Sequence, residues 1–133
     1  MTSTDEQAVL DANAAFYAAF AAADAEAMDA LWARSTEPTC VHPGWDALRG
    51  RERVMASWRA IFQSGAPPIA CAGPTVHALG TDAALVLCTE VIAGGTLVAA
   101  NVFVREPDGF RLVHHQASPA PHRPTPARRA DLN

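Results

Sequence analysis

The chain has 133 residues, of which 50% are hydrophobic and 18% are charged, and its formal net charge is −4 at pH 7. This length and composition predict one globular domain with its own core. The acidic balance argues against a nucleic-acid partner, because phosphates are bound by basic surfaces. Residues 1–7 lack the features of a signal peptide, and apolar runs are too short to span a bilayer. We therefore expect a cytoplasmic protein with no membrane partner.

Three helices are predicted in the first half of the chain. The first covers 4–23, with Thr4 as its N-cap and a stripe at i, i+4, i+7 and i+11 formed by Val9, Asn13, Phe16 and Phe20. Asp24 can cap a short second helix, which Pro38 ends. A short extended piece follows at 39–42, and a third helix is expected at 51–64.

From Ile69 the hydrophobic pattern changes from helical to alternating. Runs of β-branched and aromatic residues separated by turn residues predict four strands, at 69–79, 83–92, 96–105 and 110–118. Pro74 cannot donate to a strand ladder, so the first strand should lie at an edge or contain a bulge. Three helices followed by an antiparallel meander indicate an α+β domain over 1–118, with a Pro- and Arg-rich tail at 119–133.

Both faces of the predicted sheet are largely apolar. In 96–105 one face carries Val98, Val102 and Val104, and the other carries Leu97 and Phe103. A sheet with one face in water would alternate apolar and polar residues. The helices can cover one face, and a homodimer through the other is the simplest way to cover the second.

The order of these elements resembles a known family. The segments CVHPGWDALRG (40–50), RERVMASW (51–58) and NVFVREPDGFRLVHHQASP (101–119) resemble the SnoaL-like branch of the nuclear transport factor 2-like superfamily. The segment GPTVHALGTDAALVL (73–87) is also similar to the association domain of calcium/calmodulin-dependent kinase II, a member of that superfamily. The resemblance implies a cone-shaped curved sheet of about four long strands, packed on three helices and enclosing a pocket.

The same resemblance implies dimers joined through sheet surfaces and several unrelated activities. The superfamily includes polyketide cyclases, ketosteroid isomerases, dehydratases, epoxide hydrolases and non-catalytic association modules, so the fold does not define the function. The isomerases combine an Asp base with a Tyr and a protonated Asp. No matching set is found in this chain, whose only Tyr is Tyr17.

Strand parity identifies polar residues that share a face. A β-hairpin centred on Gly94-Gly95 would pair Cys88 with Asn101 and Val86 with Phe103, with Glu90 on the same face.

A three-residue turn at 107–109 would pair Glu106 with Phe110, which places Asn101 opposite His115 and Phe103 opposite Val113. His114 then projects from the other face, although a slip of one residue at either turn would exchange it with His115.

Glu90 and His115 are the candidate catalytic residues, since a buried carboxyl with a raised pKa suits acid–base work and His is a common proton carrier. The alternative for Glu90 is a solvated or ion-paired carboxylate, and for His114 and His115 a hydrogen-bonded core or interface histidine. His42 precedes Pro43, where the resemblance puts the pocket mouth. The full set of candidate ligand-binding residues is Phe16, Tyr17, Phe20, His42, Trp45, Trp58, Val86, Cys88, Asn101, Phe103, Val113 and His114.

We expect no metal and no cofactor. Cys40 and His42 resemble a fragment of a metal site, but further ligands at suitable spacing are missing. Cys40, Cys71 and Cys88 contain no C-x-x-C pair, so reduced thiols are expected.

Two functions remain open. One is a cofactor-independent isomerase, cyclase or dehydratase acting on a mostly apolar small molecule, polyketide- or steroid-like, with Asn101 holding an oxyanion. The other is a non-catalytic ligand-binding or association module.

Overall fold

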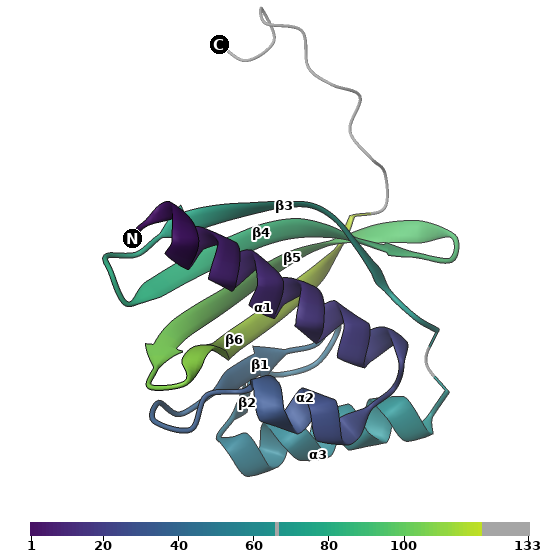
Figure 1. Ribbon diagram of the computed structural model, residues 1–133. Helices are drawn as coiled ribbons and strands as arrows, with labels where there is room; N and C mark the ends of the chain where they lie inside the picture. Colours follow the sequence, from purple (N-terminus) through teal and green to yellow (C-terminus); the bar gives the residue numbers. More distant parts are fainter. Residues whose placement is uncertain (66, 121–133) are drawn as a thin grey trace, which may run out of the picture.

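The computed structural model describes residues 1–65 and 67–120 as three helices and a six-stranded curved sheet (Figure 1). The predicted tail lies outside the described residues except for Pro119 and Ala120, which extend the last strand. In chain order, the elements are α1 (Ser3–Ala21), α2 (Ala25–Leu31), β1 (Thr39–Val41), β2 (Leu48–Arg49), α3 (Arg51–Gln63), β3 (Ala70–Ala78), β4 (Ala83–Ile92), β5 (Gly95–Glu106) and β6 (Gly109–Ala120). The α+β class expected from the sequence is confirmed.

The sheet has the strand order β2-β1-β6-β5-β4-β3. The strands β3 to β6 form the predicted antiparallel meander, and β1 adds to it in parallel alongside β6. The two-residue strand β2, which pairs with β1, was not predicted from the sequence. As Figure 1 shows, α1 crosses one face of the meander, whereas α2 and α3 lie at the β1–β2 side.

Helix α1 begins two residues earlier at its cap than expected. Thr2, not Thr4, is the N-cap: its hydroxyl accepts a hydrogen bond from the Asp5 backbone N–H at 3.1 Å, and the Asp5 carboxylate accepts one from the Thr2 backbone N–H at 3.0 Å. This reciprocal pair is a capping box, and it leaves Thr4 inside the first turn. Asp24 caps α2 as expected, through a 3.0 Å bond from the Ala27 N–H.

The β4–β5 hairpin turns on Ala93-Gly94, because Ile92 pairs with Gly95. Every pairing expected across this hairpin is therefore wrong by two positions: Cys88 faces Ala99, and Asn101 faces Val86. Side chains alternate with a period of two, so an even displacement leaves each residue on its expected face.

The β5–β6 hairpin also differs from expectation. Glu106 pairs with Gly109 rather than Phe110, which gives a two-residue turn in place of the three-residue one. A β-bulge follows between Val102 and Phe103, and the register beyond it puts Asn101 opposite His115 as predicted. Before the bulge Phe103 faces Leu112, so its predicted pairing with Val113 is wrong.

In β3, the register shifts between Ala72 and Thr75, at the Pro74 bulge, and the strand lies at an edge as predicted.

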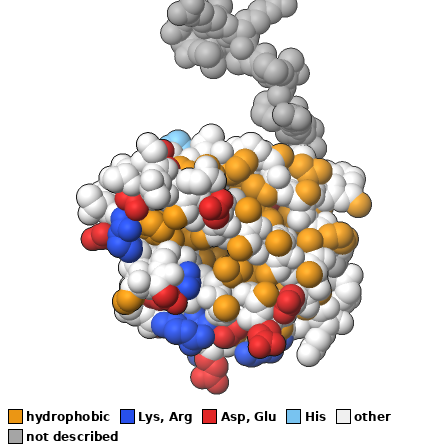
Figure 2. Space-filling view, viewed as in Figure 1, with side chains coloured by type: hydrophobic (Ala, Val, Ile, Leu, Met, Phe, Trp, Pro, Cys, Tyr) orange, Lys and Arg blue, Asp and Glu red, His pale blue; other side chains and the backbone are white. Residues whose placement is uncertain are grey.

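The core fills the space between the three helices and the inner face of the sheet. Its largest fully buried side chains include Trp32, Trp58, Phe16, Phe103, Met28 and Leu112. On the face seen in Figure 2, hydrophobic side chains gather over the middle of the molecule, and charged side chains lie mostly along its lower and left margins.

The outer face of the sheet is largely apolar, and none of the elements described within 1–65 and 67–120 covers it. Leu87, Val91 and Val98 are 39%, 43% and 53% exposed. Two hollows, of about 150 and 240 Å³, lie on this outer face next to the β3 bulge, and Gly73 and Thr89 line both of them. Neither hollow is the ligand pocket expected on the inner face, so that pocket stays a prediction. None of the helices that the structure describes is long and apolar enough to cross a membrane.

Candidate functional site

Five polar side chains meet between α1 and the inner face of the sheet. Asn13 and Tyr17 lie one turn apart on the buried side of α1, and Glu90, Asn101 and His115 come from β4, β5 and β6. Their exposed fractions are 1%, 5%, 1%, 0% and 2%, in that order. Because burying polar groups is costly unless they are paired, the hydrogen bonds among these residues decide their chemistry. We call these five residues the buried polar cluster.

Asn101 is the centre of the cluster. Its Nδ2 donates to Asn13 Oδ1 at 2.9 Å and to Tyr17 Oη at 3.2 Å. Its Oδ1 lies 2.6 Å from His115 Nδ1. Since that oxygen can only accept, Nδ1 of His115 carries the hydrogen and Nε2 of the neutral ring has a free lone pair.

Glu90 is held by a hydrogen bond from helix α1. Tyr17 Oη donates to Glu90 Oε2 at 2.6 Å, so neither Asn101 nor His115 is its hydrogen-bond partner. With its one hydrogen used, Tyr17 Oη accepts from the Cys88 thiol at 3.2 Å. The His115 Nε2 atom lies 4.0 Å from Glu90 Oε2, so an imidazole lone pair faces a carboxyl group.

Burial shifts the ionisation of this pair in opposite directions. It raises the pKa of the Glu90 carboxyl, against the smaller opposing effect of the Tyr17 hydrogen bond. It lowers the pKa of His115 to about 3, helped by His42 and His114 nearby. Both shifts favour the uncharged forms, a protonated carboxyl beside a neutral imidazole.

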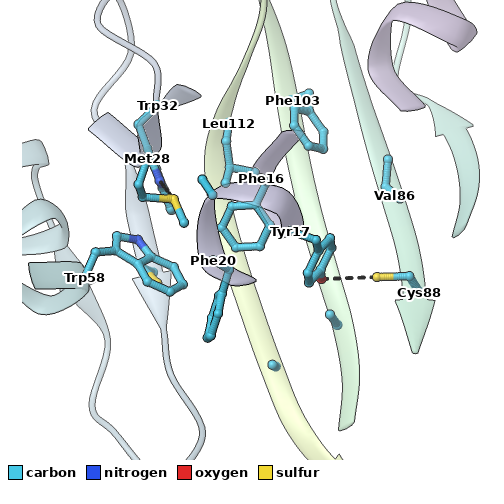
Figure 3. Close-up of a cluster of buried hydrophobic side chains, with 14 of the residues drawn as sticks. Phe16, Tyr17, Phe20, Met28, Trp32, Trp58, Val86, Cys88, Phe103 and Leu112 are labelled. Atoms are coloured by element: carbon cyan, nitrogen blue, oxygen red, sulfur yellow. Dashed lines mark hydrogen bonds between the residues drawn. The ribbon is translucent and has the colours of Figure 1, made fainter. Parts of the chain in front are cut away.

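Aromatic rings cover the pair. The ring centroids of Phe16 and Trp58 lie 4.9 and 5.7 Å from that of His115. Phe20 packs edge-on against Trp58 at 5.2 Å. Figure 3 shows Phe16 and Tyr17 side by side on α1, with Trp58 on one side of them and Cys88 on the other.

A second buried polar pair adjoins this wall. His42 Nε2 lies 2.8 Å from Ser57 Oγ, and that hydroxyl donates to the Val54 carbonyl at 2.6 Å, so His42 is the donor to Ser57. Burial lowers the pKa of His42 to about 4. The His42 ring stacks edge-on with Trp58 at 4.7 Å and lies 6.4 Å from the His115 ring.

The remaining predicted residues are divided between the two faces. Val86, Cys88 and Phe103 are buried on the inner face, and Trp45, 46% exposed, packs edge-on against His42. Val113 is partly buried at the bulge. His114 does not join the cluster: it points to the outer side, where its Nδ1 lies 2.7 Å from Thr39 Oγ1.

Sequence reasoning missed Asn13 and Ser57 as members of these polar groups. Asn13 left a readable signal, an amide in the middle of an otherwise apolar helical stripe. Ser57 left none. Within 1–65 and 67–120, no group of three or more His, Cys, Asp and Glu side chains is placed to hold a metal ion.

A curved sheet with a polar cluster buried under an N-terminal helix defines a protein of the NTF2-like class. A family profile described as a SnoaL-like domain matches residues 9–122, so the chain belongs to the SnoaL-like family. This agrees with the resemblance seen in the sequence. A comparison with curated proteins found no match.

Solved structures agree with this assignment. A putative dehydratase of the NTF2-like family from Streptomyces avermitilis has 36% identity and a TM-score of 0.81, with 88% of this chain and 96% of that chain covered. A putative calcium/calmodulin-dependent protein kinase type II association domain from Thiobacillus denitrificans has 34% identity and a TM-score of 0.65, covering 82% and 92%. A cystatin-like protein of unknown function from Nostoc punctiforme, 16% identical with a TM-score of 0.75 and 91% and 95% coverage, shares the fold.

Proposed function

We propose that this protein is a cofactor-independent enzyme that eliminates water from a mostly apolar hydroxy compound by acid–base chemistry. The observation that carries the proposal is the facing pair: the free Nε2 lone pair of His115 lies 4.0 Å from Oε2 of a carboxyl group whose pKa is raised by burial. One group can take a proton and the other can give one, as elimination requires.

The proposed step balances within this pair. His115 Nε2 takes a proton from a carbon next to the one that bears the hydroxyl, and the carbon–carbon double bond forms. The carbon–oxygen bond breaks as Glu90 gives its proton to the hydroxyl, which leaves as water. The imidazolium and carboxylate that result return to neutral when the proton passes from His115 to Glu90. Because the two groups lie 4.0 Å apart, both would act from one side of the substrate, and syn elimination is expected.

The polar surroundings support the assigned roles. Tyr17 holds Glu90 through its hydroxyl, and Asn101 holds His115 at Nδ1, so both reacting side chains are fixed in orientation. The walls are aromatic and aliphatic, which suits a polyketide- or steroid-like ring. The similar protein from Streptomyces avermitilis is described as a putative dehydratase, in agreement with this reaction class.

A substrate must displace part of the aromatic wall to reach the pair. Phe16 and Trp58 both pack on His115, and both are 1% exposed or less. The proposed entry lies on the side of His42 and Trp45, since Trp45 is the exposed aromatic residue next to this wall.

The test is an elimination assay with a panel of cyclic and aryl β-hydroxy ketones, followed by the ultraviolet absorbance of the enone product. We expect turnover by the wild type and a loss of about 100-fold or more in Glu90→Gln and in His115→Gln, the size typical of general acid–base groups. His114→Gln is the matched control, because that ring lies on the outer side, and it should keep full activity.

A second candidate is a non-catalytic ligand-binding or association module. The observation that favours it is the closed inner face, together with 34% identity to the putative kinase association domain. A thermal-shift screen with the same ketones separates the two candidates: stabilisation without turnover, unaffected by Glu90→Gln, would replace the enzyme by a binding module. Ligand at 100 times its dissociation constant stabilises a fold by about 2.7 kcal/mol.

The proposed assembly is a homodimer through the outer face of the sheet. Leu87, Val91 and Val98 are exposed there, where no helix or strand in the described part of the chain covers them, and an apolar sheet face of this kind is typical of an interface.

A further inference from the structure

Asn13 is a buried amide in an apolar stripe, and both ends of its side chain are engaged. Its Oδ1 accepts the 2.9 Å bond from Asn101, and its Nδ2 donates to the Cys71 thiol sulfur at 3.6 Å. It lies too far along this chain of bonds to touch a substrate at the Glu90–His115 pair. Its shortest polar route to that pair runs through Asn101, which contacts both Asn13 and His115.

We propose that Asn13 is a positioning residue that sets the tautomer of His115 by fixing the orientation of the Asn101 amide. The functional meaning of this inference rests on the proposed role of His115 as a base. The inference itself concerns only where a hydrogen lies in the resting protein.

The orientation of Asn101 follows from what its neighbours can offer. The Nδ2 group has two hydrogens, and α1 presents two oxygens to receive them, Asn13 Oδ1 and Tyr17 Oη. Tyr17 Oη has only one hydrogen, which goes to Glu90 at 2.6 Å, so toward Asn101 it can only accept. Reversing the amide would place Asn101 Oδ1 against two acceptors, and each buried unpaired group costs about 1–3 kcal/mol.

The orientation of Asn101 then determines the hydrogen of His115. With Oδ1 toward the imidazole at 2.6 Å, the ring must present N–H at Nδ1. The lone pair at Nε2 is left facing Glu90. A reversed amide would present N–H to Nδ1 and favour the other tautomer, whose Nε2 hydrogen would point at Glu90 and leave no base there.

Asn13 is itself suited to hold its orientation. Its Oδ1 meets the Asn101 amide of β5, and its Nδ2 is then free to donate to the Cys71 sulfur of β3, so this orientation leaves neither end of the side chain unpaired. The i, i+4 spacing of Asn13 and Tyr17 presents both acceptors from one face of α1, so a single helix supplies the whole constraint.

The test determines the tautomer of His115 directly, by long-range ¹H–¹⁵N NMR of the full chain near neutral pH. In a neutral imidazole the nitrogen that carries the hydrogen and the one that does not have very different ¹⁵N chemical shifts. The wild type should show N–H at Nδ1. Asn13→Leu removes the acceptor while keeping a similar size, and should convert His115 partly or wholly to the Nε2–H form. Asn13→Asp is the matched control: burial keeps the introduced carboxyl protonated, so it accepts from Asn101, donates toward Cys71, and preserves the wild-type tautomer.

Two results would overturn the inference: a wild-type ring already in the Nε2–H form, or an Asn13→Leu ring that stays fully in the Nδ1–H form. Loss of the Nδ1–H form in Asn13→Asp would also count against it, because that variant keeps the acceptor. If Asn13→Leu does not fold, Asn13→Ala is measured in the same way with the same expected change. The inference and the proposed enzyme function can fail separately. If the His115 tautomer changes in Asn13→Leu while Glu90→Gln leaves the elimination rate unchanged, the inference holds and the proposed enzyme function is wrong.

Discussion

Glu90 is a buried carboxyl whose protonation bears on stability and on the proposed chemistry. It is 1% exposed, it accepts a hydrogen bond from Tyr17, and the neutral imidazole of His115 lies 4.0 Å away. A carboxyl in such a place is more easily buried with its proton than without it. Its ionisation is therefore linked to folding.

Because of this linkage, we expect the free energy of unfolding to depend on pH differently in wild type and in Glu90→Gln. The folded pKa of Glu90 is raised, so the folded chain holds this proton more tightly than the unfolded chain does. The resulting stabilisation is fully present below the unfolded carboxyl pKa, about 4.3, and is lost as pH rises through the folded value, by up to about 1.4 kcal/mol per pH unit. Denaturant unfolding from pH 4 to 8 should show wild type losing free energy of unfolding relative to Glu90→Gln.

The histidines contribute with the opposite sign. The lowered pKa values of His42 and His115 give stabilisation that is present above about 6.5 and lost as pH falls. Both variants share this contribution, so it cancels in the difference between them. Parallel curves for wild type and Glu90→Gln across the whole range would show that Glu90 titrates normally in the folded protein.

The polar residues of the site were partly predictable from the sequence. Strand alternation was enough to put Glu90, Asn101 and His115 on one face. It could not identify Tyr17 as the donor to Glu90, because that contact depends on how α1 is rotated and placed above the sheet. Contacts within a sheet follow from local register, whereas contacts between helix and sheet depend on packing that no short-range pattern records.

At the scale of elements, the start of α1 shows how two similar signals compete. Both Thr2 and Thr4 precede acidic residues, and the sequence pattern suggested Thr4. In the structure Asp5, three residues after Thr2, accepts a hydrogen bond from the backbone N–H of Thr2. Thr4 has no acidic side chain at the corresponding position.

This difference predicts unequal effects of two matched substitutions. Thr2→Ala should lower the free energy of unfolding by about 1 kcal/mol, the usual cost of losing an N-cap. Thr4→Ala, inside the first turn, should have little effect or a slightly stabilising one, because Ala has the higher helix propensity. Thermal unfolding of both variants measures the contrast, and an equal loss in the two would contradict the assigned cap.

The strands show why a wrong register still led to the correct faces. The β4–β5 turn lies one residue earlier than expected, and the β5–β6 turn is one residue shorter. The residues expected on the inner face of the sheet nevertheless lie there. In the β4–β5 hairpin the displacement is even, and in the β5–β6 hairpin the bulge before Asn101 compensates for the shorter turn. Burial on the inner face selects the side-chain alternation more strongly than turn residues select the loop.

At the scale of the whole molecule, the two faces of the sheet are in unequal environments. The inner face is covered by α1, whereas the outer face leaves Val98 53% exposed along with Leu87 and Val91. The strand pattern predicted this apolar outer face, but which surface covers it could not be read from one chain. A second copy is the proposed cover, because a twofold interface needs only a self-complementary patch.

The dimer is tested by light scattering after gel filtration, which should give about twice the 14.0 kDa chain mass for the wild type. Val98→Glu places a charge in the proposed interface, where burying it without a partner is costly, and should shift the protein to monomer. Ala60→Glu adds the same charge to the exposed side of α3 and should leave the dimer intact. A wild type that runs as a monomer at micromolar concentration would remove the proposed interface. Equal dissociation of both variants would mean that added charge, rather than the outer sheet face, controls assembly.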